Sequence, residues 1–101
     1  MKVYISGAIS GKKKLDVQWN FAIVEKLLNK NGFDVINPLK ISDWDLEWPT
    51  YLAIAKVLIC SGEVDALYML DGWDQSKGSR LEHKWAKEKG LLITYQKKAG
   101  A

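Results

Sequence analysis

A near-continuous apolar run at residues 64–70 constrains the fold more than any other part of this sequence. Only Asp65 interrupts the run, and so few polar residues are typical of a parallel strand that is covered on both faces. A polar loop at residues 71–79 follows, and a helix-like run then extends from about Arg80 to Lys89, before Gly90. Open α/β sheets bind ligands where strands end and helices begin, so this loop is the first candidate for a functional site.

The rest of the chain alternates strands with helices. Short apolar runs predict strands at residues 2–5, 33–36 and 91–95. A helix is predicted at residues 16–31, with Asp16 as its N-cap and Gly32 beyond its end. Its apolar stripe consists of Val17, Phe21, Val24 and Leu28, widened by Ile23 and Leu27. A second helix starts at Pro49 or Thr50 and is apolar on nearly all sides, which predicts deep burial or a subunit interface.

This order of elements predicts a three-layer α/β fold of the Rossmann or flavodoxin type. About four parallel strands in the order 2-1-3-4 would carry helices on both faces. The loops after the first and third strands would then meet and form the walls of one cleft. We expect one domain at residues 1–95, followed by a frayed tail at residues 96–101.

Composition limits the classes of function. The net charge of +3 is too small and too scattered to predict nucleic-acid binding. Cys60 is the only cysteine, which excludes an internal disulfide and fits a reducing compartment. With one His as well, a His/Cys zinc site has too few ligands, and we expect no metal and no cofactor. No signal or membrane-spanning pattern is seen, so we expect a cytoplasmic protein without membrane contact.

The loop after the first strand carries Ser6, Gly7 and Gly11, followed by three lysines. It is one residue short of a P-loop and is not a dinucleotide-binding fingerprint. Two interpretations remain open. The glycines can form a plain tight turn, or they can let backbone N–H groups approach a phosphate or sugar.

Two different roles, one structural and one catalytic, are possible for Glu82. Ser79 and Glu82 have the spacing of a capping box, in which Glu82 would only stabilise the start of the helix. The other interpretation is a nucleophilic carboxylate directed into the cleft. Spacing alone favours the capping box.

Several motifs resemble one known superfamily. They are Tyr4-Ile5-Ser6-Gly7 with Gly11, Val35-Ile36-Asn37-Pro38, residues 65–73, and Ser76-x-Gly78-x-x-x-Glu82-x-x-x-Ala86-x-x-x-Gly90. Together, over about residues 2–95, they resemble the nucleoside 2-deoxyribosyltransferases. The likeness is greatest to a small uncharacterised branch of bacterial and phage proteins related to the deoxynucleoside 5′-monophosphate N-hydrolases.

The resemblance implies chemistry at the N-glycosidic bond of a deoxynucleoside or its 5′-monophosphate. Glu82 matches the catalytic glutamate. Tyr4, at the end of the first strand, is either placed to orient that carboxylate or a core residue. Asp71 and Asp74 are candidates to protonate the leaving base, with solvated loop acids as the other interpretation. The expected substrate contacts are Ser6, Gly7, Gly11, Trp73, Ser76, Gly78 and Ser79. Trp73 can stack on a base or pack against another subunit. A homo-oligomer is also implied.

The sequence departs from the transferase pattern at three places. Ser76 stands where the transferases carry an Asp, as in the monophosphate hydrolases, where the serine helps to hold phosphate. A second family Asp has no counterpart near Ala55 or Val57, and the C-terminal Asn-containing segment has none either. These departures keep two alternatives open: a nucleotide-binding module without catalysis, and a structural or interaction protein with a Trp-rich surface.

Overall fold

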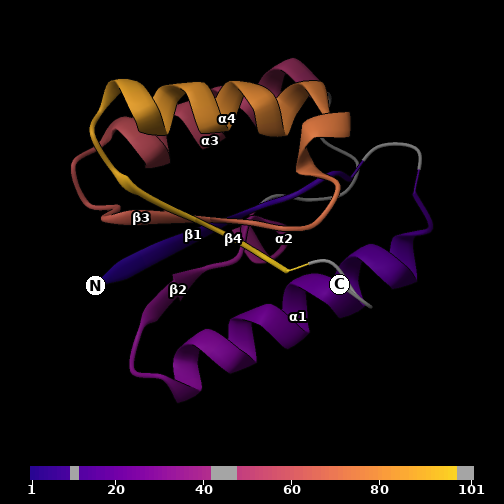
Figure 1. Ribbon diagram of the computed structural model, residues 1–101. Coiled ribbons are helices and arrows are strands. Elements are labelled where there is room, and N and C mark those ends of the chain that lie inside the picture. Colours follow the sequence, from indigo (N-terminus) through magenta and orange to yellow (C-terminus); the bar gives the residue numbers. More distant parts are fainter. Residues whose placement is uncertain (10–11, 42–47, 98–101) are drawn as a thin grey trace.

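Four parallel strands in the order β2-β1-β3-β4 form the centre of the protein, as the computed structural model shows (Figure 1). The structure describes residues 1–9, 12–41 and 48–97. In chain order the elements are β1 (Lys2–Ser6), α1 (Lys14–Lys30), β2 (Asp34–Ile36), α2 (Pro38–Ile41), α3 (Trp48–Cys60), β3 (Ala66–Met69), a 3-10 turn η1 (Trp73–Gln75), α4 (Lys77–Glu88) and β4 (Leu92–Tyr95). The predicted α/β fold and its strand order are confirmed.

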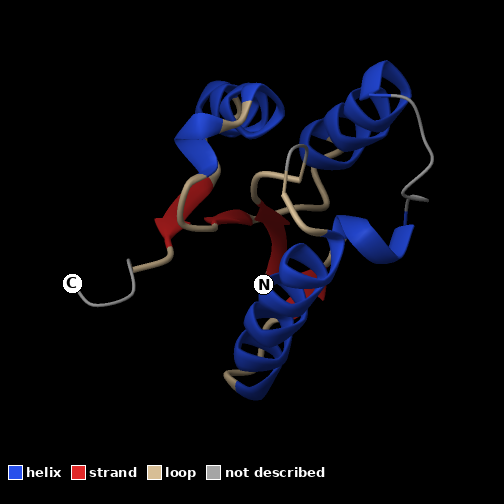
Figure 2. Ribbon diagram, turned by 90° about the vertical axis from the view of Figure 1, so that its right-hand side faces the viewer, coloured by secondary structure: helices blue, strands red, loops and turns tan. Residues whose placement is uncertain are grey.

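Helices cover the two faces of the sheet unequally (Figure 2). α1 lies against one face, and α3 and α4 lie side by side against the other. The side chains of β1 alternate between these layers, because successive residues of a strand point to opposite faces. Val3 and Ile5 pack in the core beneath α1, whereas Tyr4 packs in the core beneath α3 and α4.

The four central residues of the buried stripe of α1 are as predicted. The start of the helix and the width of the buried stripe differ from the prediction. Val17, Phe21, Val24 and Leu28 are buried against the sheet. The helix starts at Lys14, so Asp16 lies in its first turn and is not the N-cap. Ile23 and Leu27, predicted to widen the buried stripe, are exposed. A helix packed against a flat sheet buries only the side that faces it, and these two residues lie beyond that side.

Helix α3 is less buried than its composition predicts. Ala55 and Ile59 pack in the core, but Val57 points to solvent. The short helix α2 follows β2, and residues 42–47 lie outside the described part of the chain. Of the helices described, none combines the length and the apolar character that crossing a membrane requires.

The start of α4 also differs from the prediction. The helix begins at Lys77, and its N-cap is Ser76, whose Oγ accepts a 3.3 Å hydrogen bond from the backbone N–H of Ser79. The predicted capping box of Ser79 and Glu82 is therefore wrong. Both residues lie inside the helix and are buried against the sheet. Glu82 is thus free of the role that spacing alone favoured.

Candidate functional site

Glu82 is a carboxylate buried between α4 and the sheet. Its side chain is 3% exposed. The Tyr4 hydroxyl donates a 2.7 Å hydrogen bond to Oε2, and the Ser6 hydroxyl donates a 2.7 Å hydrogen bond to Oε1. Both of these hydrogen-bond donors are neutral hydroxyls, and among the described residues no ion pair involves Glu82. A buried acid held without a cation is costly to maintain and is typical of a functional position.

Two simple periodicities bring the three side chains together. Tyr4 and Ser6 are two residues apart on β1, so both point to the face covered by α3 and α4. On α4, Ser79, Glu82 and Ala86 follow one another at intervals of three and four residues and form the buried side of the helix. The Glu82 carboxylate consequently lies above the carboxyl end of β1, where α/β sheets bind ligands.

Burial governs the protonation of this cluster. Loss of hydration raises the pKa of Glu82 to about 7, and the hydrogen bonds from Ser6 and Tyr4 oppose that rise because they stabilise the ionised form. Burial, followed by the nearby Glu82 carboxylate, raises the pKa of the Tyr4 hydroxyl well above its usual value. Near neutral pH both forms of Glu82 are populated, while Tyr4 stays a hydrogen-bond donor.

Tyr51 extends the cluster from the first turns of α3. Burial, followed by the charge of the Glu82 carboxylate, raises the pKa of the Tyr51 hydroxyl, and a side-chain hydrogen bond with Tyr4 opposes this rise. Three elements that are far apart in sequence therefore meet at one carboxylate. Sequence reasoning counted Tyr51 only as an apolar residue of the helix, and no motif marks it.

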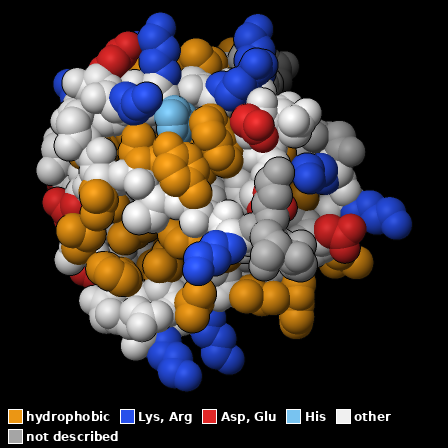
Figure 3. Space-filling model, in the orientation of Figure 1, with side chains coloured by type: hydrophobic (Ala, Val, Ile, Leu, Met, Phe, Trp, Pro, Cys, Tyr) orange, Lys and Arg blue, Asp and Glu red, His pale blue; other side chains and the backbone are white. Residues whose placement is uncertain are grey.

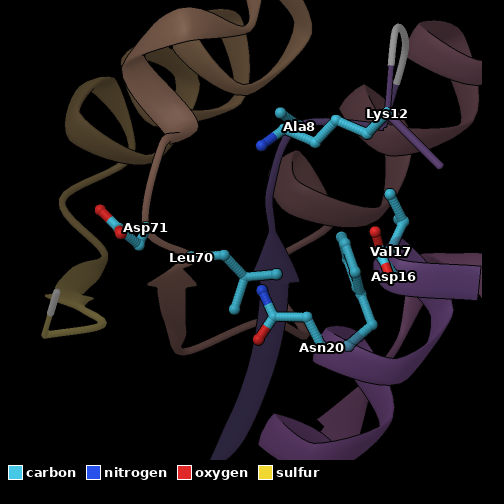
Figure 4. Close-up of a pocket in the computed structure, with 8 residues that line it drawn as sticks. Ala8, Lys12, Asp16, Val17, Asn20, Leu70 and Asp71 are labelled. Atoms are coloured by element: carbon cyan, nitrogen blue, oxygen red, sulfur yellow. The ribbon is translucent and has the colours of Figure 1, made fainter. Parts of the chain in front are cut away.

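A separate hollow of about 160 Å³ lies where the loops after β1 and β3 meet (Figure 4). Leu70 and Asp71 line it from the loop after β3, and Ala8 and Lys12 line it from the loop after β1. The first turns of α1 complete it with Asp16, Val17, Asn20 and Phe21. The two loops thus meet at one end of the sheet, as predicted. No sequence motif marks Lys12, Asp16 and Asn20, which also line the hollow.

Glu82 is not among the residues that line this hollow. Leu70 and the α1 side chains belong to the core on one face of the sheet, and Tyr4 belongs to the core on the other. Ser6 connects the two regions. Its hydroxyl binds Glu82, and its carbonyl accepts a 2.8 Å hydrogen bond from the backbone N–H of Leu70.

Gly7 allows the two loops to approach closely. A Cβ at this position would lie 2.7 Å from Cδ1 and 3.0 Å from Cβ of Leu70. The glycine is therefore required for packing, which is a third explanation beside the tight turn and the phosphate contact considered from sequence. Gly11, the other glycine predicted to contact substrate, lies outside the described residues.

Trp73 has a partner within the chain. Its ring stacks on the ring of His83 with 4.3 Å between centroids, and the Tyr95 hydroxyl lies 2.8 Å from Nε2 of His83. His83 is partly buried in this contact. Asp71 is exposed, and its backbone N–H donates a 2.9 Å hydrogen bond to the side chain of Gln96.

The start of α4 holds the three residues predicted to bind phosphate. Ser76 caps the helix, and Gly78 lies in its first turn. Ser79 is 2% exposed, and within the described part of the chain its Oγ is buried with no hydrogen-bond partner. Buried hydroxyls normally have a partner, so this unused group at the positive end of a helix dipole is notable.

Comparison with protein families adds one finding. The family model described as a domain of unknown function, DUF4406, matches residues 1–95, which include all four strands. The chain belongs to the DUF4406 family. No curated protein matches it. The family description names no activity, and the Glu82 cluster with its surroundings is the feature of this member that suggests one.

Proposed function

We propose that this DUF4406 protein cleaves or transfers the N-glycosidic bond of a 2′-deoxynucleoside or its 5′-monophosphate, with Glu82 as the nucleophile. The observation that carries the proposal is the pair of 2.7 Å hydrogen bonds that hold the Glu82 carboxylate at the end of β1. They fix both oxygens, as a nucleophile that must attack along one direction requires. The sequence resemblance to the nucleoside 2-deoxyribosyltransferases supports the same role.

The chemistry needs an ionised carboxylate. One Glu82 oxygen forms a bond to the anomeric carbon while the bond from that carbon to the base nitrogen breaks, and the electron pair leaves with the base. The product is a glycosyl ester of Glu82, and water or a second base then attacks the same carbon and frees the carboxylate. A neighbouring carboxylate also stabilises the positive charge that develops on the sugar. With a pKa of about 7, half of Glu82 is ionised near neutral pH.

The surroundings supply roles for the remaining groups. The leaving base needs a proton, and Asp71, which lines the hollow, is the proposed donor. The hollow of about 160 Å³ is smaller than the sites that take whole drug-sized ligands, and its size suits a single base. The unpartnered Ser79 hydroxyl at the start of α4 is the proposed contact for a 5′-hydroxyl or 5′-phosphate oxygen.

A second candidate function is nucleotide binding without turnover. The favouring observation is that Glu82 is 3% exposed and does not line the hollow. A substrate would have to displace the groups that cover the carboxylate before attack. If that never happens, the hollow binds a base and the Glu82 cluster serves only to join α4 to β1.

Release of free base distinguishes the two candidates. The full chain is incubated with each deoxynucleoside and each 5′-monophosphate, with and without a second base as acceptor, and the bases are separated by chromatography. If Glu82 is the nucleophile, the wild type releases base and Glu82→Gln releases at least about 100-fold less. Glu88→Gln, which changes an exposed residue on the same helix, is the control and should release as much base as the wild type. Ligand-induced stabilisation without release in any variant would support binding alone.

A further inference from the structure

Helix α1 carries a line of large apolar side chains that face solvent. Leu15 is 78% exposed, Trp19 70%, Ile23 47% and Leu27 50%. Because they are spaced four residues apart, they form one continuous ridge along the helix. We call these four residues the α1 ridge. Single exposed apolar residues are ordinary, but a contiguous row of this kind marks a surface that binds something.

On its α1 side, the edge strand β4 beside the α1 ridge is not covered by any helix among the described residues. Two long helices protect the other face, whereas α1 is the one long helix among the described residues on this face, and β4 extends past it (Figure 2). Ile93 packs in the core beneath α3 and α4, so its neighbours Leu92 and Thr94 point to the α1 side. Leu92 is 55% exposed and Thr94 is exposed as well.

The ridge and the uncovered strand adjoin each other. Asn20 of α1 accepts a 3.3 Å hydrogen bond from Gln96, which follows β4 directly. Ile23 and Leu27 lie three and seven residues after Asn20 and therefore lie on the same side of the helix. Figure 3 shows hydrophobic side chains exposed over this part of the molecule. The exposed side of α1 and the exposed strand β4 beside it thus form one continuous surface.

We propose that this surface binds a second copy of the chain, so that α1 of each copy lies beside α1 of the other and covers the other copy's β4. The exposed strand β4 offers an apolar side chain, Leu92, and the α1 ridge supplies a helix with an exposed apolar side. A two-fold axis satisfies both needs at once, since each copy then gives and receives the same element. The proposal does not depend on the proposed function.

The size of the surface fits this occupant. A helix of 17 residues is about 25 Å long. On each copy the contact would span two helices side by side, its own α1 and the α1 of the partner, which is about 20 Å. The projected area of the contact is then on the order of 500 Å², without the extra area of projecting side chains. Stable dimers bury about 800 Å² of accessible surface per partner. The accessible area of a surface with projecting Trp and Leu side chains exceeds its footprint, so the two figures are comparable.

The positive charge around the α1 ridge distinguishes binding of a second copy from binding to a membrane. Lys12, Lys13, Lys26 and Lys30 are exposed near the α1 ridge or at its ends, and they repel one another when two copies meet. Salt screens this repulsion, so self-association is expected to strengthen as the ionic strength rises. Attachment of a basic apolar helix to an anionic membrane would show the opposite dependence, because salt weakens attraction to the lipid head groups.

Sedimentation velocity of the full chain tests the proposal. The wild type is expected to form dimers whose fraction grows with protein concentration and with salt. Trp19→Lys and Leu92→Lys change the two halves of the surface and are each expected to weaken dimerisation roughly 30-fold or more, since each change occurs twice in a symmetric dimer. Val57→Lys is the matched control: it replaces a side chain that is 69% exposed on the opposite layer, and the dimer should persist.

All three positions are exposed, so circular dichroism should show unchanged thermal unfolding of the monomer. A wild type that stays monomeric at high micromolar concentration would overturn the proposal. So would a dimer that Val57→Lys disrupts and Trp19→Lys does not. Binding of a monomeric chain to vesicles of phosphatidylcholine and phosphatidylserine, lost in Trp19→Lys and weakened by salt, would replace the second copy with a membrane.

Discussion

The Tyr4 hydroxyl donates a 2.7 Å hydrogen bond to Oε2 of Glu82, a residue 78 positions further along the chain. The bond joins the middle of the sheet to the second turn of α4, within a region that water does not reach. In this setting a hydrogen bond to a charged group is worth more than on the surface. The ionisation of Glu82 therefore depends on Tyr4.

Tyr4→Phe removes this donor and keeps the ring that fills the core. The hydrogen bond lowers the pKa of Glu82, so its loss is expected to raise that pKa further above the ordinary value. Activity at neutral pH should fall roughly tenfold, because a hydrogen bond to a charged group contributes about 1.5–3 kcal/mol. The rise of the rate with pH should also move to higher pH.

Rates of base release measured across pH check this expectation. Tyr95→Phe serves as the control, because Tyr95 is an exposed tyrosine that is hydrogen-bonded to His83 rather than to Glu82. An unchanged pH profile in Tyr4→Phe would show that Tyr4 does not influence the ionisation of Glu82.

Glu82→Gln should change how stability depends on pH. The folded pKa of Glu82, about 7, lies above the unfolded value of 4.5, so the folded state holds its proton more tightly. Its contribution to stability is full below pH 4.5 and is lost as the pH rises through 7. The wild type should lose roughly 3 kcal/mol of unfolding free energy over this range, and Glu82→Gln should lose far less. Urea unfolding at pH 4.5 and 8 measures the difference, and parallel pH dependence in both proteins would refute it.

Gly7→Ala should destabilise the protein. The added methyl group would lie 2.7 Å from Cδ1 of Leu70, so one of the two loops has to move. Overpacking of this kind costs about 1–3 kcal/mol. Chemical denaturation of Gly7→Ala, Leu70→Ala and the double variant tests the cause. The alanine at position 7 should cost less when Leu70 is already shortened, and strictly additive losses would exclude this contact as the origin.

Ser76→Ala should lower stability by about 1 kcal/mol, the usual effect of losing an N-cap. The cause is loss of the hydrogen bond that Ser76 Oγ accepts from the Ser79 N–H. Ser76→Asn keeps an acceptor at this position and should restore most of the loss in thermal unfolding. If Ser76→Ala were as stable as the wild type, the capping contact would be of no consequence and Ser76 would be available to a ligand.

The α/β architecture could be predicted from the sequence because the local patterns agree with how the elements pack in the structure. The apolar run around Leu67 required cover on both faces, and the alternation of strands and helices favoured the strand order that the structure shows. The same reasoning placed the loops after β1 and β3 at one end of the sheet, which the hollow between Ala8 and Asp71 confirms. The hydrogen bond between Tyr4 and Glu82, expected from family resemblance, is present in the structure.

Other features could not be predicted from the sequence because they depend on which side of a helix or strand packs against its neighbours. Ile23 and Leu27 fit an apolar stripe by spacing, but only packing decides how wide a stripe the sheet covers. Ser76 and Ser79 are both good N-caps, and spacing chose the wrong one. Tyr51 reaches Tyr4 through tertiary structure alone, so no periodicity could reveal it.

The central claim is that Glu82 itself forms a bond to the sugar. The most direct test is mass spectrometry of peptides after the full chain has turned over a deoxynucleoside or its monophosphate and has been quenched rapidly with acid. We expect a deoxyribosyl mass on the peptide that contains Glu82 of the wild type, and in Glu82→Gln no adduct and at least about 100-fold less base release. Base release that Glu82→Gln retains, or a sugar adduct on any other residue, would contradict it.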